Sequence, residues 1–157
     1  MANEEQLKRL QEGGIKEWNT WYMGEWHKNS TSADLSNANL EGMNLCDGYF
    51  RRVDLRYTNL RNCMLMGTNL CGANLLGADL TNVALFETMF CKTNLHNAIG
   101  LKSCRHLGPS GLDPLTCMLS NSVPREFMQG CGWLDNLIET IMALRQSVPG
   151  GEEIIRL

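Results

Sequence analysis

A repeat of five residues occupies the middle of the chain and constrains its fold more than any other feature. Residues 33–97 divide into thirteen units of five, whose centres run from Leu35 to Leu95. Every centre is Leu except Phe50 and Phe90. On an α-helix, a step of five residues advances about 140° beyond a full turn, so the centres would spread around the helix and leave no apolar face. The repeat therefore excludes a helix.

Short extended segments explain the repeat. Alternation along a strand places each centre and the small residue two positions before it on one face, with the Asn or Asp between them on the other. The two residues after the centre are often Gly, Asn or Asp, which are typical of turns. Repetition of this unit gives a polygonal coil lined inside by alternating large and small side chains. We therefore expect an all-β solenoid.

The units ADLSN, ANLEG, ANLLG and ADLTN match the consensus A(D/N)LXX, and in them the chain resembles the pentapeptide-repeat family. The resemblance implies a right-handed, quadrilateral β-helix with four repeats per coil, so that thirteen repeats make about three coils. It also implies that residues twenty apart stack in columns. We expect three parts: a cap over residues 1–30, the β-helix over 31–98, and a tail over 99–157.

The first part has the pattern of an amphipathic helix. Apolar residues recur at roughly helical spacing opposite a charged side, and Gly13-Gly14 predicts a bend. The apolar set is Leu7, Leu10, Ile15, Trp18, Trp21 and Tyr22. A coil stack exposes unpaired backbone groups at its ends, so we expect a helical cap here.

The tail also predicts helices. Asp113 followed by Pro114 is typical of a helix start, and a second short helix should end at Gly130. A third, over LDNLIETIMALRQ, is amphipathic. Its predicted docking face consists of Leu134, Leu137, Ile138, Ile141 and Leu144.

A second resemblance concerns both flanks. HLGPSGLDPLT and VPREFMQGCGWLDNLIETI look like the segment that joins the repeats to a C-terminal Toll/interleukin-receptor (TIR) effector domain in some bacterial pentapeptide-repeat proteins. EEQLKRLQEG and EWNTW are similar to the N-terminus of those proteins. The sequence stops at GGEEIIRL, so the resemblance implies that an effector domain either follows in a longer protein or is missing. None of its NAD chemistry is assigned to these residues.

Composition excludes several classes of protein. With 14 basic and 17 acidic residues, the chain lacks the basic excess of a nucleic-acid-binding protein. No segment approaches the ~18–20 apolar residues of a membrane span, and the acidic start lacks a secretory signal. Seven cysteines without a CxxC pair favour free thiols in the cytoplasm. We expect no cofactor and no metal; Cys104 and His106 are the nearest to a ligand pair.

The residues that could form a site differ between the faces of the solenoid. Two faces keep Asn or Asp before each centre. On the other two, Met64, Met66, Phe86, Tyr49 and Met89 are expected to point outward, with Arg51, Cys71 and Cys91 just past the centres on one of them. An exposed apolar patch marks an interaction site, unless the N-terminal segment or the tail folds back over it; both alternatives stay open.

The sequence predicts a scaffold rather than an enzyme. Its three histidines, His27, His96 and His106, form no cluster in the sequence that predicts acid–base chemistry. We expect a non-catalytic module for protein–protein interaction and self-assembly, forming a homo-oligomer or filament that could cluster a TIR effector. The alternative is a DNA mimic that binds gyrase. Six acidic against five basic residues between Thr31 and Ala98 count against the dense negative charge of a mimic.

Overall fold

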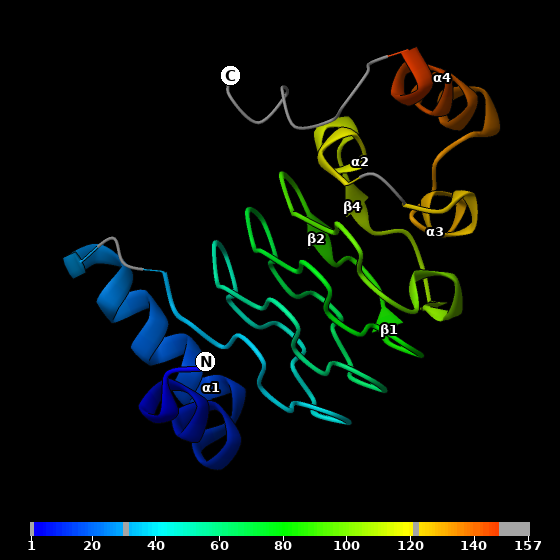
Figure 1. Cartoon of the computed structure of the whole chain (residues 1–157). Coiled ribbons are helices and arrows are strands. Elements are labelled where there is room, and N and C mark those ends of the chain that lie inside the picture. Colours follow the sequence, from blue (N-terminus) through cyan, green and yellow to red (C-terminus); the bar gives the residue numbers. More distant parts are fainter. Residues whose placement is uncertain (1, 30–31, 121–122, 148–157) are drawn as a thin grey trace.

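A computed structural model describes residues 2–29, 32–120 and 123–147. A stack of coils fills the middle of the molecule, with one long helix at its first end and three shorter helices at the other (Figure 1). The elements are α1 (Glu4–Asn29), β1 (Ala84–Leu85), β2 (Met89–Phe90), a 3-10 turn η1 (Leu101–Ser103), β3 (Arg105–His106), β4 (Gly111–Leu112), α2 (Pro114–Leu119), α3 (Arg125–Gly130) and α4 (Asp135–Ser147).

The coils repeat every 20 residues, as the resemblance implied. Parallel bridges join Asp34 to Asp54, Asp54 to Asn74 and Asn74 to Asn94. Three further columns of bridges begin at residues 39, 44 and 49, so each coil has four bridged sides. The centre residues of the repeats are all buried in one continuous core. The packing of large and small inward residues is therefore what the five-residue pattern predicts.

Regular strands are fewer than an all-β solenoid suggests. The second residue after every centre, thirteen positions from Asn37 to Asn97, has a positive φ between 51° and 71°. This left-handed conformation turns the chain at each corner and leaves only a few extended residues per side. In most coils the pairing is consequently a single bridge, and the described residues contain only four strands of two residues each. The expectation of short strands holds only in this reduced form.

Polar side chains brace each corner from both sides of the backbone. Outside, Asn69 Oδ1 accepts a hydrogen bond from the Cys71 amide at 3.0 Å, and the same bond recurs at eight other Asn or Asp positions. Inside, the buried Thr68 hydroxyl donates to the Leu45 carbonyl at 2.8 Å. Thr58, Thr88 and Thr93 repeat this bond between coils. The small inward residues thus also satisfy backbone carbonyls.

We expect Thr68→Val to lower the free energy of unfolding by about 1 kcal/mol, because the Leu45 carbonyl loses one buried donor while the volume is kept. Urea unfolding measures this. The matched control is Thr20→Val, since the exposed Thr20 hydroxyl also bonds a backbone carbonyl, that of Lys16 at 2.9 Å. An equal loss in both variants would show that the buried position adds nothing.

The helix α1 covers the first coil, as predicted for the N-terminal cap. It kinks at Gly14, which has φ 69° and ψ −174°. Its Asn19 side chain accepts from the Tyr49 amide and donates to the Asp47 carbonyl, both at 2.9 Å. Gln11 donates to the Asn39 carbonyl at 3.0 Å. Side chains of the cap therefore pair with the backbone groups that an open coil would expose.

The stack continues beyond the last repeat with a shifted register. Ala84 pairs with Arg105 and Met89 with Gly111, steps of 21 and 22 residues instead of 20. After this turn, α2 closes the end: the Thr116 hydroxyl accepts from the Thr93 amide at 3.1 Å, and the Ser120 hydroxyl accepts from the Leu95 amide at 2.8 Å. The repeat ends at residue 97, but the coil does not.

The tail helices α2, α3 and α4 begin and end close to their predicted positions, with Asp113 as the N-cap of α2. The predicted docking face of α4 is wrong as a single face. Ile138 and Ile141 are buried, whereas Leu134, Leu137 and Leu144 are exposed. The helix is turned toward α2 because Arg145, on its other flank, bonds the carbonyls of Cys117, Ser120 and Val123.

The three predicted parts correspond to α1, the coils and the tail, and the expected coil boundary at residue 98 lies within the continuous stack. Residues 30–31 at the first boundary, and the terminal GGEEIIRL at the end of the tail, lie outside the described residues.

Candidate interaction surface

The candidate surface lies on two adjacent sides of the coil stack. Met64 stands between Asn44 and Ala84 in one column of bridges, and Asn69 stands between Tyr49 and Met89 in the next. Tyr49 is 43% exposed, Met64 37%, Phe86 38% and Met89 38%, and Met66 is half-buried. The structure therefore exposes four of the five predicted surface residues and partly exposes the fifth.

The most continuous apolar part is a column just past the centres on the first side. Cys46, Met66 and Phe86 follow Leu45, Leu65 and Leu85 at intervals of 20 residues. Leu107 continues the column because its amide bonds the Leu85 carbonyl at 2.8 Å, and it is 55% exposed. We call Met64, Met66, Phe86 and Leu107 the apolar column.

Leu107 was missed by the sequence reasoning. A strict step of 20 from Phe86 reaches His106, and only the register of 21 between β1 and β3 brings Leu107 into line. The signal in the sequence was weak: an apolar residue between His106 and Gly108, in a segment without a period.

A charged corner separates the apolar column from the second side. The corner positions Asp47, Gly67 and Glu87 have positive φ, and both acidic residues are exposed. A Cβ on Gly67 would lie 2.3 Å from the Asp47 carboxylate, so that carboxylate rests on the glycine above it. Tyr49 and Met89 are thus neighbours of the apolar column across a corner, rather than parts of one flat patch.

The two alternatives for these sides are now distinguishable among the described residues. The tail does not fold back over the sides: β3 and β4 extend the same columns upward as the next turn of the stack. It touches one surface residue there, because the Phe86 ring lies against Gly108, where an added Cβ would be 2.5 Å away. The cap contacts Tyr49 through its backbone, whose carbonyl accepts from Trp18 Nε1 at 2.9 Å.

A cleft opens beside Met89 on the second side. It has a volume of about 360 Å³ and is lined by Arg51, Arg52, Asn69, Cys71, Gly72, Met89, Cys91, Lys92 and Asp113. The Asp113 carboxylate accepts from the Thr116 amide at 2.7 Å and from the Lys92 amide at 3.1 Å. Three basic side chains and one acidic side chain therefore surround two thiols.

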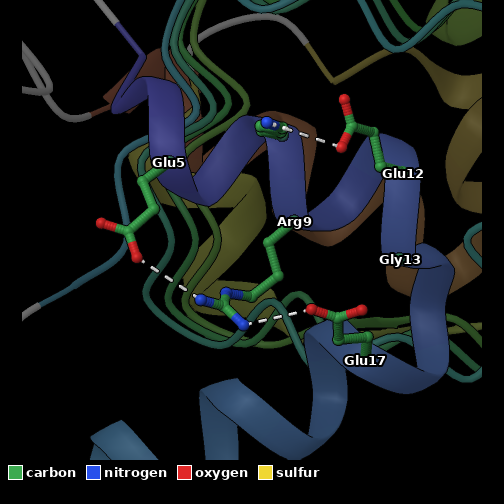
Figure 2. A pocket seen from close by; sticks show the side chains of 6 residues that line it. Glu5, Arg9, Glu12, Gly13 and Glu17 are labelled. Carbon is green, nitrogen blue, oxygen red and sulfur yellow. Dashed lines mark hydrogen bonds and ion pairs between the residues drawn. The ribbon is translucent and has the colours of Figure 1, made fainter.

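A second pocket lies on α1 and contains the densest group of carboxylates. Figure 2 shows Arg9 between Glu5 and Glu17, with ion pairs of 3.4 and 3.1 Å, and Lys8 beside Glu12 at 3.8 Å. The Glu17 side chain lies against Gly13 at the kink. These are exposed ion pairs along one helix, which stabilise it weakly and provide no nucleophile or convergent acid–base pair.

The histidines and the predicted ligand pair do not form a chemical site. The His106 ring packs edge-on against Phe127 at 5.2 Å, and burial lowers its pKa. Burial likewise raises the pKa of Cys104 to about 12, so its thiol stays protonated. Within the described ranges no three His, Cys, Asp or Glu side chains are grouped to hold a metal ion. The side chain of His27 lies outside the described part.

The arginines of the coils are largely matched by acids. Arg56 bonds the Asp54 carboxylate at 2.6 Å and Arg61 bonds Asp79 at 3.2 Å. The Arg56 guanidinium helps to hold the pKa of the Asp54 carboxyl below its usual value, although burial opposes it. Mixed charge of this kind does not resemble the uniform negative surface of a nucleic acid duplex.

No helix in the described part of the chain has the length and apolar character to cross a membrane.

Comparison with known proteins agrees with the repeat. Residues 33–70, 49–85 and 63–99 match the family described as pentapeptide repeats (8 copies). No curated protein matches the chain.

Three solved structures are similar to the chain. A pentapeptide repeat protein from the Arabidopsis thaliana thylakoid lumen is 21% identical over 70% of this chain and 74% of its own, with a TM-score of 0.46. One from Nostoc PCC 7120 is 26% identical over 58% and 76%, with a TM-score of 0.32. HetL of the same organism, involved in heterocyst differentiation regulation, is 28% identical over 43% and 34%, with a TM-score of 0.22.

Proposed function

Residues 33–99 belong to the pentapeptide-repeat family, whose members are generally non-catalytic interaction scaffolds, and on that premise we propose that this chain binds a second copy of itself through the apolar column. The single observation that carries the proposal is the uncharged, exposed run of Met64, Met66, Phe86 and Leu107 along one side of a rigid rod. Apolar surface of this kind is stabilised when it is removed from water.

A second copy fits this side because the column is complementary to itself. In a two-fold arrangement the same residues meet on both partners, and no like charges would face each other along the column. The acids Asp47 and Glu87 stand at its edge, where water still solvates them. Thioethers adapt their shape to a partner, which suits an interface built from Met64 and Met66.

The ends of the rod favour side-to-side pairing over a filament. End-to-end stacking would need free backbone groups on the first and last coils. The side chains of Asn19 and Gln11 bond such groups at the first end, and those of Thr116 and Ser120 do so at the other. We therefore propose a discrete dimer in place of the filament.

We expect the dimer to dissociate with a Kd of about 1–100 µM, because a face of this size is at the small end of specific interfaces. Met66→Glu and Phe86→Glu, each tested alone, should weaken association at least about tenfold, since each places two carboxylates against each other in an apolar contact. Molar mass from light scattering after size exclusion, across a hundredfold range of concentration, measures this.

The matched control is Ile99→Glu. Ile99 is 56% exposed and lies on another side, in the column of Asn39, Asn59 and Asp79. It should leave the molar mass unchanged. A monomer at all concentrations, or an equal effect of Ile99→Glu, would overturn lateral pairing through the apolar column.

The finer features of the proposal follow the family resemblance. We propose a right-handed, four-sided coil, a cytoplasmic location in keeping with seven free cysteines, and, where a TIR effector follows the tail in a longer protein, pairing that brings two effectors together. The alternative of a gyrase-binding DNA mimic has less support, because the arginines leave the coils almost neutral.

A further inference from the structure

Two cysteines lie one above the other on the second side of the rod. Cys71 follows the centre Leu70 and Cys91 follows Phe90, and the bridge between Asn69 and Met89 fixes them in register. The Gly72 amide donates to the Cys91 carbonyl at 2.7 Å. Neighbouring strands are about 4.8 Å apart, and disulfides join Cα atoms about 4.4–6.8 Å apart. The backbone therefore already holds the two residues at a distance that a disulfide spans.

The two thiols also contact each other. Burial, and then a hydrogen bond with Cys71, raise the pKa of Cys91 to about 11. Cys91 thus keeps its proton and donates it to the Cys71 sulfur, a contact that favours the thiolate on Cys71. Both side chains are half-buried and line the cleft described above.

The other cysteines lack this combination of contact and access. Cys63, Cys117 and Cys131 are buried. Cys46 is half-buried like the pair, but in its column the residue above it is Met66, so that it has no thiol to react with. Cys46 is therefore a natural internal control.

We propose that Cys71 and Cys91 form a reversible disulfide by exchange with an anionic low-molecular-weight disulfide, which binds in the basic cleft beside them. Arg51, Arg52 and Lys92 line that cleft, and the carboxylate of Asp113 is engaged by two backbone amides. A cleft with an excess of positive charge raises the local concentration of an anion.

The exchange has two steps. The Cys71 thiolate attacks one sulfur of the small disulfide, whose S–S bond breaks and releases a small thiolate, leaving a mixed disulfide on Cys71. Cys91 then gives its proton to water or buffer and attacks the Cys71 sulfur, releasing the second small thiolate. Two protein thiols are oxidised, and one small disulfide is reduced to two thiols, which take up the two protons.

Oxidised and reduced glutathione at fixed ratios, at pH 8 without oxygen, test the proposal. After acid quenching and alkylation, cleavage after Lys and Arg and before Asp separates peptide 62–78, which carries Cys71, from peptide 79–92, which carries Cys91. We expect a disulfide joining these peptides without retained glutathione. In Cys91→Ser, glutathione should remain on Cys71. Cys46→Ser should change neither result.

Separate glutathione adducts on Cys71 and Cys91, without the linked peptides, would overturn the disulfide. The same would follow if Cys46 reacted as fast as Cys71. The readout is chemical and does not depend on self-association, so its failure is distinct from failure of the proposed dimer.

The basic cleft has its own test. Arg51→Gln combined with Lys92→Gln should slow exchange with oxidised glutathione about three- to tenfold at low salt. Exchange with neutral 2-hydroxyethyl disulfide should keep its rate in the same variant. Equal rates of wild type and variant with oxidised glutathione, or equal slowing with both disulfides, would overturn the role of the cleft.

Discussion

Trp18→Ala is expected to lower the free energy of unfolding by about 3–5 kcal/mol, the range for removal of a buried aromatic side chain. Trp18 is fully buried between α1 and the first coil. Its ring stacks on Phe50 with centroids 5.2 Å apart and on Tyr22 at 5.9 Å. Its Nε1 donates to the Tyr49 carbonyl at 2.9 Å. The substitution leaves a cavity and also an unpaired carbonyl under the cap.

Two variants separate these contributions. Trp18→Phe keeps most of the ring contact and loses the donor, so we expect a cost of about 1–2 kcal/mol. Trp21→Ala serves as the control on the same helix: Trp21 is half-buried, with Arg9 5.6 Å above its ring, and its loss should cost about 1 kcal/mol. Urea unfolding followed by circular dichroism gives the values. Equal costs at positions 18 and 21 would contradict the role of Trp18 as the anchor of the cap.

Arg145→Ala is expected to cost about 2–4 kcal/mol. The guanidinium donates to the Cys117 carbonyl at 2.8 Å, to the Ser120 carbonyl at 3.1 Å and to the Val123 carbonyl at 3.1 Å. These carbonyls lie at or beyond the end of α2, where no helical partner remains for them. Charge-assisted hydrogen bonds to half-buried groups are among the stronger ones. Burial lowers the pKa of Arg145, but a guanidinium stays charged in proteins.

The control in the same tail is Arg125→Ala. Arg125 bonds the exposed Asp135 carboxylate at 2.9 Å, and an exposed ion pair contributes about 0–1 kcal/mol. Hydrogen exchange of the α4 amides should accelerate strongly in Arg145→Ala and little in Arg125→Ala. Arg145→Lys should fall between wild type and Arg145→Ala, because one ammonium cannot reach three carbonyls in a fixed fork. Unchanged α4 exchange in Arg145→Ala would refute the link between α4 and α2.

The five-residue period predicted the coil because each repeat satisfies the same local requirements. The inward Leu, the small residue before it, the bracing Asn or Asp and the corner all act within a few residues of one another, as at Thr68 to Gly72. The overestimate of strand arose from the same unit. The left-handed corner leaves too few extended residues for a ladder, and the consensus does not state how much of each side is extended.

Features outside the repeat were harder to predict because they depend on long-range contacts. Arg145 is polar and lies beside an apolar helix face, so its sequence context indicated a solvated side chain. Its bonds are to carbonyls more than twenty residues away, and they turn α4 away from the predicted face. Similarly, Cys71 and Cys91 were placed in one column by the repeat, but their contact and the basic cleft depend on Asp113 and α2.

The step of 20 residues between bridged positions also sets how such a chain can change in length. An insertion of 20 residues would add one layer of about 4.8 Å and leave every side above it facing as before. An insertion of five would turn everything above it by a quarter of a revolution and separate Phe86 from Met66. The rod can therefore grow only in whole coils if it is to keep its binding side intact, and the steps of 21 and 22 beyond residue 84 mark where that arithmetic stops applying.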